Sequence, residues 1–171
     1  VSVGVVWAQD PTPESAMVGL WEKFDAAKCY APKAADTPMI KAPQTKEPPY
    51  RIAVSNSYIG NDWRTEMIQM ARAYGNHPEM KPYISELYVV SSGNDANAQI
   101  AIVDSMIAAG YDAIILNTAS EDALNPVVKR AHDAGILVIS FDNVSSSPYA
   151  IRINEDQFEF GKVMAEWLVK Q

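Results

Sequence analysis

The chain is poor in cysteine and in long apolar runs, and each shortage excludes a class of protein. Cys29 is the single cysteine among 171 residues, so neither an intrachain disulfide nor a cysteine metal cluster can form. Its neighbour Lys28 is not the small residue that a lipoprotein anchor requires, so we expect an incidental thiol. No apolar run reaches the ~18–20 residues that a membrane-spanning helix needs.

Basic residues are also few. Lys and Arg number 14 against 21 Asp and Glu, which gives a net charge of −7 and a pI of about 4.8. Nucleic acids and anionic membranes both attract basic patches, so neither is an expected partner. Because 48% of the residues are hydrophobic, the chain is not disordered and can bury a core. This balance favours a protein that meets neutral small molecules.

The sequence motifs of common enzymes are missing. There is no nucleophile elbow, no phosphate-binding loop with its lysine and no dinucleotide fingerprint. The two histidines, His77 and His132, are too far apart in sequence for a metal site. A phosphoryl-accepting receiver domain would carry paired acids after the first strand, where this chain has Ser55-Asn56-Ser57. We therefore expect no enzyme, no cofactor and no metal.

The first 50 residues differ from the rest. Residues 1–8 are mostly apolar and end in Ala8, which is typical of the tail of a cleaved signal peptide and indicates an exported protein. Residues 9–50 read as an arm, with one short helix over residues 14–30 and a proline-rich linker after it. Seven of the eleven prolines lie in this region.

From residue 51 the pattern alternates regularly between strand and helix. Apolar runs predict strands at 52–54, 84–90, 113–116, 136–141 and 151–153, and helical spacing predicts helices at 61–74, 95–109, 120–134 and 156–170. Gly75, Gly110 and Gly135 are read as helix stops, and Thr118 with Glu121 as a capping box for the third helix. The prediction is an α/β fold, a doubly wound parallel sheet of about five strands with helices on both faces.

Polar residues follow four of these strands. Since ligands bind beyond the carboxyl ends of parallel strands, these residues should share one site. Carboxylates and amides hydrogen-bond to neighbouring hydroxyls, an aromatic face covers the apolar side of a sugar ring, and arginine adds fixed donors. The candidate ligand-binding residues are Asn61, Trp63, Arg64, Asn117, Asp142, Asn143 and Asn154.

Several of these residues also have a purely structural explanation. Asn61 and Asn154 could each be only the cap of the helix that follows, and Asn117 could be only a turn residue. Trp63 could pack into the core beside Met67. The sequence leaves both explanations open.

Three segments carry a resemblance to a known family: RIAVSNSYIGNDWRTEM, AAGYDAIILNTASEDALNPVVKRAHDAGILVISFDN and INEDQFEFGKVMAEWL. They occur in that order within residues 51–171, which resemble the first lobe of the ribose and galactofuranose class of periplasmic sugar-binding proteins. The Trp63-Arg64 pair is more similar to the galactofuranose branch. Asn143 departs from the family, which often has arginine there, and the arm is longer than the family's usual start.

The resemblance implies a transport receptor that captures a monosaccharide between two lobes and delivers it to a membrane permease of an ABC importer. It implies that Trp63 stacks on the sugar, that Arg64 and Asp142 bind its hydroxyls, and that Asn117 and Asn143 assist. We expect a monomer at full length. In this chain we expect the second lobe to be absent, so that sugar binding is very weak.

A second hypothesis comes from another functional class. The effector-sensing domain of a Lac-type transcription repressor shares this fold. It would need a DNA-reading helix-turn-helix upstream, whereas residues 1–50 offer prolines and the tail of a signal peptide.

Overall fold

The computed structural model describes residues 46–171 of the chain. The predicted signal-peptide remnant at residues 1–8 and most of the predicted arm at residues 9–50 lie outside the described residues. Those two predictions therefore remain predictions.

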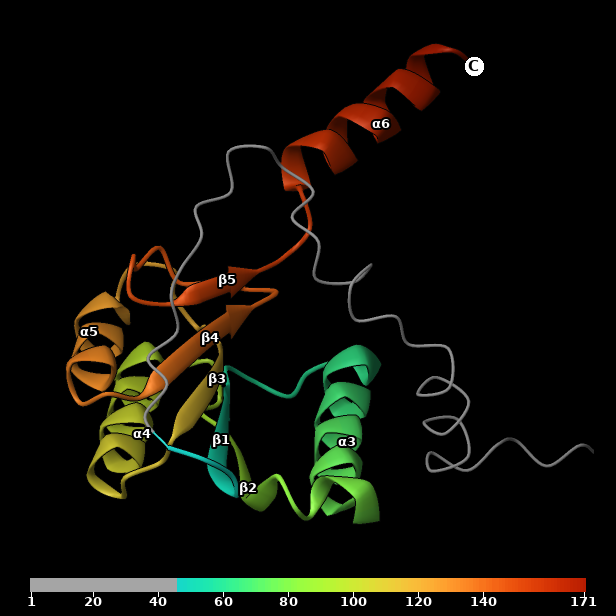
Figure 1. The fold of residues 1–171 in the computed structure, drawn as a ribbon. Helices are drawn as coiled ribbons and strands as arrows, with labels where there is room; N and C mark the ends of the chain where they lie inside the picture. Colours follow the sequence, from blue (N-terminus) through green and yellow to red (C-terminus); the bar gives the residue numbers. More distant parts are fainter. Residues whose placement is uncertain (1–45) are drawn as a thin grey trace, which may run out of the picture. The chain divides into compact units, whose positions relative to one another are not determined.

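A five-stranded, all-parallel sheet organises the described part (Figure 1). The strands are β1 (Tyr50–Asn56), β2 (Ile84–Ser91), β3 (Ala113–Asn117), β4 (Leu137–Phe141) and β5 (Ile151–Ile153), in the order β2-β1-β3-β4-β5. Every neighbouring pair is parallel. The sequence-based prediction of the fold class is confirmed. Because β1, β3 and β4 are neighbours, their carboxyl ends lie at one edge.

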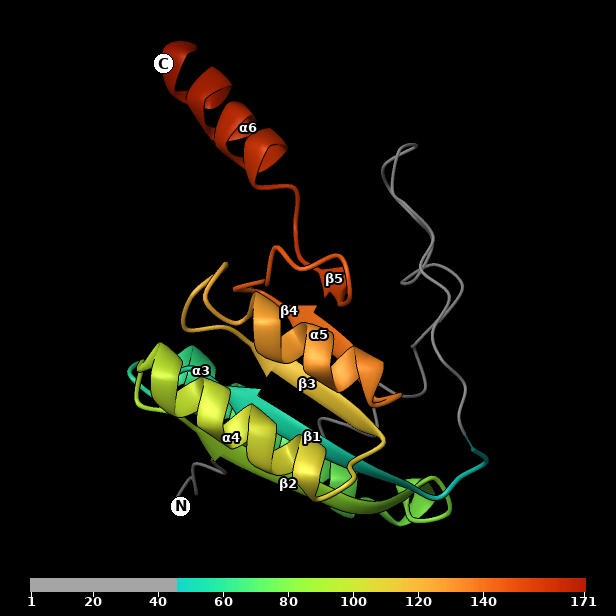
Figure 2. The ribbon, with the colours of Figure 1, turned by 90° about the vertical axis from the view of Figure 1, so that its left-hand side faces the viewer.

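Helices cover both faces of the sheet. Helix α3 (Asp62–Asn76) lies on one face, while α4 (Ala96–Ala108) and α5 (Asn125–Asp133) pack side by side on the other (Figures 1 and 2). A short 3₁₀ helix, η1 (Pro78–Met80), follows α3. The main core lies between the sheet and α4 and α5, and its fully buried members include Val103, Met106, Ile114, Leu116, Leu124, Val127, Val128 and Val138.

Two sequence-based details were wrong. Helix α3 does not stop at Gly75 but runs through it to Asn76. Gly75 is buried against Leu87 of β2, and a Cβ there would lie 2.5 Å from the Leu87 side chain, so the glycine serves close packing. The predicted helix at 120–134 begins only at Asn125, after a turn.

The predicted capping box is also absent. Thr118 donates from its backbone nitrogen and its hydroxyl to the carbonyl oxygen of Asn143, at 2.8 and 2.9 Å. It thus ties the end of β3 to the end of β4 instead of capping a helix. The spacing to Glu121 was misleading because the local sequence could not reveal this long-range partner.

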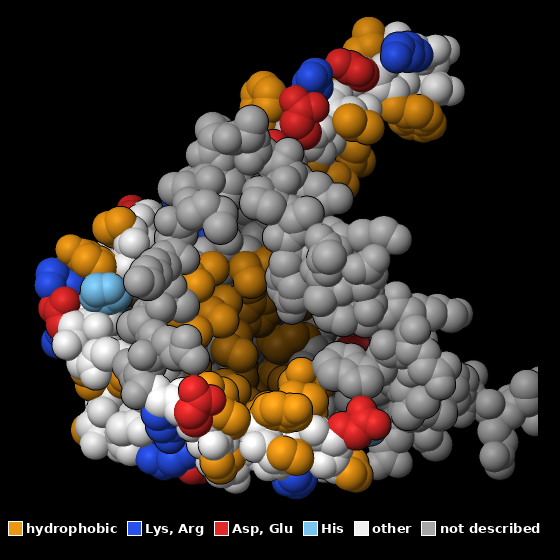
Figure 3. Space-filling view, in the orientation of Figure 1, with side chains coloured by type: hydrophobic (Ala, Val, Ile, Leu, Met, Phe, Trp, Pro, Cys, Tyr) orange, Lys and Arg blue, Asp and Glu red, His pale blue; other side chains and the backbone are white. Residues whose placement is uncertain are grey.

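The last helix, α6 (Gln157–Val169), is amphipathic but exposed. Its apolar stripe consists of Phe160, Val163, Met164, Trp167 and Leu168, each at least 58% exposed. Hydrophobic side chains are visible along this helix and in the hollowed sheet face beside α3 (Figure 3). Among residues 46–171, none of the helices is both long and apolar enough to cross a membrane.

At the amino-terminal edge of the sheet, a charged cluster joins β1, β2 and Tyr111, which lies just before β3. Glu86 of β2 accepts hydrogen bonds from the Tyr111 hydroxyl at 2.7 Å and from Arg51 Nε at 2.9 Å. The Arg51 guanidinium also lies 4.5 Å from the centre of the Tyr111 ring. Tyr111 and Arg51 together hold the pKa of Glu86 below its ordinary value. Partial burial and the same hydrogen bond raise the pKa of Tyr111.

Replacement of Glu86 by glutamine should therefore reduce the acid sensitivity of the fold. A lowered folded-state pKa means that the contribution of ionised Glu86 is complete above its ordinary pKa of 4.5 and is lost as pH falls through the lowered value. We expect the melting temperature of Glu86→Gln to fall less than that of the parent when the pH is lowered from about 6 to about 3. An exposed Glu121→Gln control should follow the parent, and a Glu86→Gln curve parallel to the parent would contradict the assignment.

Candidate functional site

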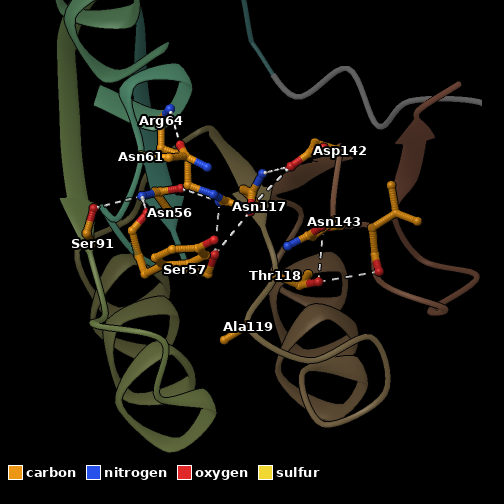
Figure 4. A network of polar contacts seen from close by, with 12 residues as sticks. Asn56, Ser57, Asn61, Arg64, Ser91, Asn117, Thr118, Ala119, Asp142 and Asn143 are labelled. Atoms are coloured by element: carbon orange, nitrogen blue, oxygen red, sulfur yellow. Dashed lines mark hydrogen bonds and ion pairs between the residues drawn. The ribbon is translucent and has the colours of Figure 1, made fainter. Parts of the chain in front are cut away.

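The candidate site lies where β1, β3 and β4 end and their loops leave the sheet (Figure 4). Asn56 is the last residue of β1 and is paired in register with Asn117, the last residue of β3. Asp142 directly follows β4. This register brings residues that are far apart along the chain into one hydrogen-bonded network.

Arg64 is the centre of this network. It lies in the first turn of α3 and is only 4% exposed. Its Nη1 donates to Asn117 Oδ1 at 2.6 Å, Asn56 Oδ1 at 3.0 Å and Ser57 Oγ at 3.0 Å. Its Nη2 reaches Asp142 Oδ2 at 3.4 Å. One buried cation thus joins the ends of β1, β3 and β4.

Aromatic rings hold the Arg64 guanidinium from the side of the β1–α3 loop. Its central carbon lies 4.5 Å from the centre of the Tyr58 ring and 5.7 Å from that of Trp63. The Tyr58 ring lies against Gly60. A Cβ at that position would lie 2.5 Å from the ring, so the glycine leaves room for it. Tyr58 of the loop and Trp63 of α3 therefore restrict the Arg64 guanidinium before any ligand arrives.

Asn117 connects the arginine with the carboxylate. It is fully buried, its Oδ1 accepts from Arg64 and Ser57, and its Nδ2 donates to Asp142 Oδ2 at 2.9 Å. These contacts fix the amide orientation. Both short contacts of Asp142 fall on Oδ2, so within the described residues Oδ1 is the oxygen left to accept from a ligand.

Asp142 has an unusual backbone. Its φ of 56° lies in the left-handed region, which non-glycine residues rarely adopt and which aspartate and asparagine tolerate best. Its nitrogen donates to the carbonyl oxygen of Ile153 at 3.2 Å, so β5 helps to hold this conformation. Backbone strain of this kind is concentrated at binding and catalytic sites.

The exposed part of the site is smaller than the sequence suggested. Trp63 is 51% exposed and the Asp142 side chain 35%, while Arg64 and Asn117 are buried and their polar atoms already bonded. Trp63 and Asp142 both lie against the Arg64 guanidinium, and a half-exposed indole ring and a partly exposed carboxylate suit a ligand with adjacent hydroxyls and an apolar ring side. In this state Arg64 and Asn117 mainly position Asp142.

The other predicted site residues lie at different distances from this network. The Asn61 side chain caps α3 by accepting from the Arg64 nitrogen at 2.9 Å, so the structural alternative describes it well. The Asn143 side chain is exposed beside Asp142, and its backbone oxygen holds Thr118. Asn154 is exposed one residue beyond β5 and takes no part in the network.

Sequence reasoning missed several members of the network. Asn56, Ser57 and Tyr58 stand in the same loop as the predicted residues and could have been chosen from their position after β1. Gln99 could not, because it sits in the apolar sequence of a helix. Among the described residues, every buried side-chain nitrogen or oxygen has a hydrogen-bond partner.

Residues 52–171 match the family model of the periplasmic binding protein domain. This chain belongs to that family. One curated relative is the D-ribose/D-allose-binding protein of Pseudomonas aeruginosa, which is 38% identical to this chain over 104 residues. The match covers 58% of this chain and 31% of that protein. The galactofuranose-binding protein YtfQ of Escherichia coli is 29% identical over 126 residues, covering 70% of this chain and 38% of that protein.

Solved structures agree with this assignment. An ABC transporter solute-binding protein from Thermobispora bispora superposes with a TM-score of 0.62 at 32% identity, covering 67% of this chain and 36% of that chain. The chain thus spans about a third of the length of the curated relatives that it matches.

Proposed function

We propose that this chain is the sugar-binding lobe of a solute receptor that serves an ABC importer. The observation that carries the proposal is the Arg64–Asn117–Asp142 array at the carboxyl edge of the sheet, with the exposed ring of Trp63 beside it. The names of both curated relatives, which bind ribose or allose and galactofuranose, support a monosaccharide ligand.

In this proposal the ligand is a neutral monosaccharide. Its apolar face stacks on Trp63, and adjacent hydroxyls donate to Asp142 Oδ1, with Asn143 as a second contact from the same loop. The positive charge of Arg64 is already matched by Asp142, so the site does not select an anionic sugar. The periplasm, a membrane permease as partner and a monomeric state at full length belong to the same proposal.

The direct test is titration of the chain with a panel of pentoses, hexoses and inositols, followed by nuclear magnetic resonance. We expect millimolar binding of at least one sugar, because the described rim contacts only one side of a ligand. The shifted signals should include the Trp63 indole and the Asp142 and Asn143 amides. Absence of any shift across the panel would refute the proposed function.

The Asp142→Asn variant tests the role of the carboxylate. Asparagine tolerates the left-handed backbone, so the loop should be retained while the charged acceptor is lost. We expect affinity for the bound sugar to fall by about tenfold, the value of one charge-assisted hydrogen bond. Asp133→Asn, on the exposed end of α5, is the matched control and should bind like the parent. Unchanged affinity in Asp142→Asn would remove Asp142 from the site.

A further inference from the structure

Gln99 is a fully buried polar residue near the start of α4, on the face of the sheet that α4 and α5 cover. Its Nε2 donates to the carbonyl oxygen of Asn117 at 2.9 Å and lies 3.2 Å from Ser55 Oγ and 3.3 Å from the Ser55 carbonyl oxygen. Its Oε1 accepts from the Ala119 nitrogen at 2.7 Å. Both ends of the amide are therefore used by backbone at the end of β3.

These contacts flank Thr118, the residue that follows Asn117 of the candidate site. The backbone on both sides of Thr118 is held by Gln99, through Asn117 and Ala119, while Thr118 itself is held from the other side by Asn143. The β3–β4 pairing ends at Leu116, so the ladder to β4 no longer constrains Asn117. Beside the remaining pairing of Asn117 with Asn56 of β1, Gln99 adds a restraint from α4 where the pairing with β4 stops.

We propose that Gln99 is a positioning residue for the ligand site, a role that rests on the proposed function. It fixes the backbone of Asn117, whose Nδ2 then holds Asp142 Oδ2 at 2.9 Å and whose Oδ1 holds Arg64 at 2.6 Å. Through these contacts α4 sets the direction of the Asp142 carboxylate at the carboxyl edge of the sheet. Gln99 itself touches no ligand.

The chemistry of the side chain explains why glutamine stands here. The site needs a donor for Asn117 and an acceptor for Ala119 on one planar group, and the glutamine amide supplies both without charge and without depending on pH. Methionine has a similar length but offers neither, so it would leave a buried carbonyl and a buried N–H unpaired. Glutamate keeps the acceptor, and regains the donor only when it is protonated.

The experiment compares the parent chain with Gln99→Met, Gln99→Glu and the exposed control Gln69→Met, which lies on α3. Two readouts are recorded at a temperature where all four proteins are folded. The first is the side-chain amide signal of Asn117 without ligand, assigned through an Asn117→Ser variant. The second is affinity for whichever sugar the parent binds.

For Gln99→Met we expect the Asn117 amide signal to shift by more than its line width or to broaden, and sugar affinity to fall by at least about tenfold. For Gln99→Glu we expect affinity to recover as pH is lowered and the carboxyl gains a proton. Gln69→Met should match the parent in both readouts.

The two readouts separate this proposal from the proposed function. If Gln99→Met leaves both the Asn117 signal and the affinity unchanged, or changes stability alone, the positioning role is refuted. If the parent binds no sugar in the panel, the proposed function fails, and the ligand-free Asn117 signal still decides whether Gln99 orients that side chain.

Discussion

The Arg64→Met variant should be less stable than the parent by about 3 kcal/mol. Methionine preserves much of the aliphatic length but removes a buried cation that donates to Asn56, Ser57 and Asn117. Three buried acceptors then lose a charged donor together. The Asp142 carboxylate is partly exposed, so water can hydrate it when Arg64 is removed. Loss of the Arg64–Asp142 ion pair therefore costs less stability than loss of a fully buried ion pair would.

Urea unfolding followed by circular dichroism measures this effect, and α3 provides its control. Arg72 lies on the same helix but is exposed, so Arg72→Met should change the free energy of unfolding by no more than about 0.5 kcal/mol. Equal stability of the two methionine variants would show that the Arg64 network does not hold the strand ends together.

The Leu116→Ala variant should lose roughly 3 kcal/mol of stability, because it removes a fully buried side chain and leaves a cavity. Leu116 belongs to the core between the sheet and the α4–α5 layer. It also directly precedes Asn117, so partial collapse of the cavity would displace the site residue. We therefore expect sugar affinity to fall together with stability.

The control for this prediction is Leu168→Ala on α6. Leu168 is 69% exposed, and alanine favours helix formation, so the change in unfolding free energy should lie within about 0.5 kcal/mol of zero. A loss in Leu168→Ala as large as that in Leu116→Ala would contradict the exposed position of Leu168 on α6.

Much of the fold could be predicted because its signals are local. The run Ala113–Leu116 is apolar along its length, residues 151–153 alternate isoleucine with Arg152, and both segments form strands. Parallel pairing follows from the alternation of strand and helix, and it places Asn117 and Asp142 at one edge. The convergence of Arg64 with these residues was expected on the same ground, and the structure shows it.

The parts that failed depend on partners far away in sequence. Gly75 looked like a helix stop because nothing local reveals that Leu87 packs against it. Thr118 matched a capping box, although its bonds go to Asn143. Gln99 gave no signal in the sequence, because a polar residue within a helix normally faces solvent. Its partners, Ser55 of β1 and Asn117 of β3, are far away along the chain.

The left-handed backbone of Asp142 restricts how this rim can change over evolution. Only glycine, asparagine and aspartate accept that conformation readily, and glycine offers no side chain. The acceptor at this corner is therefore confined to two amino acids. Under the proposed function, a change in sugar preference would therefore fall to exposed neighbours such as Trp63 and Asn143.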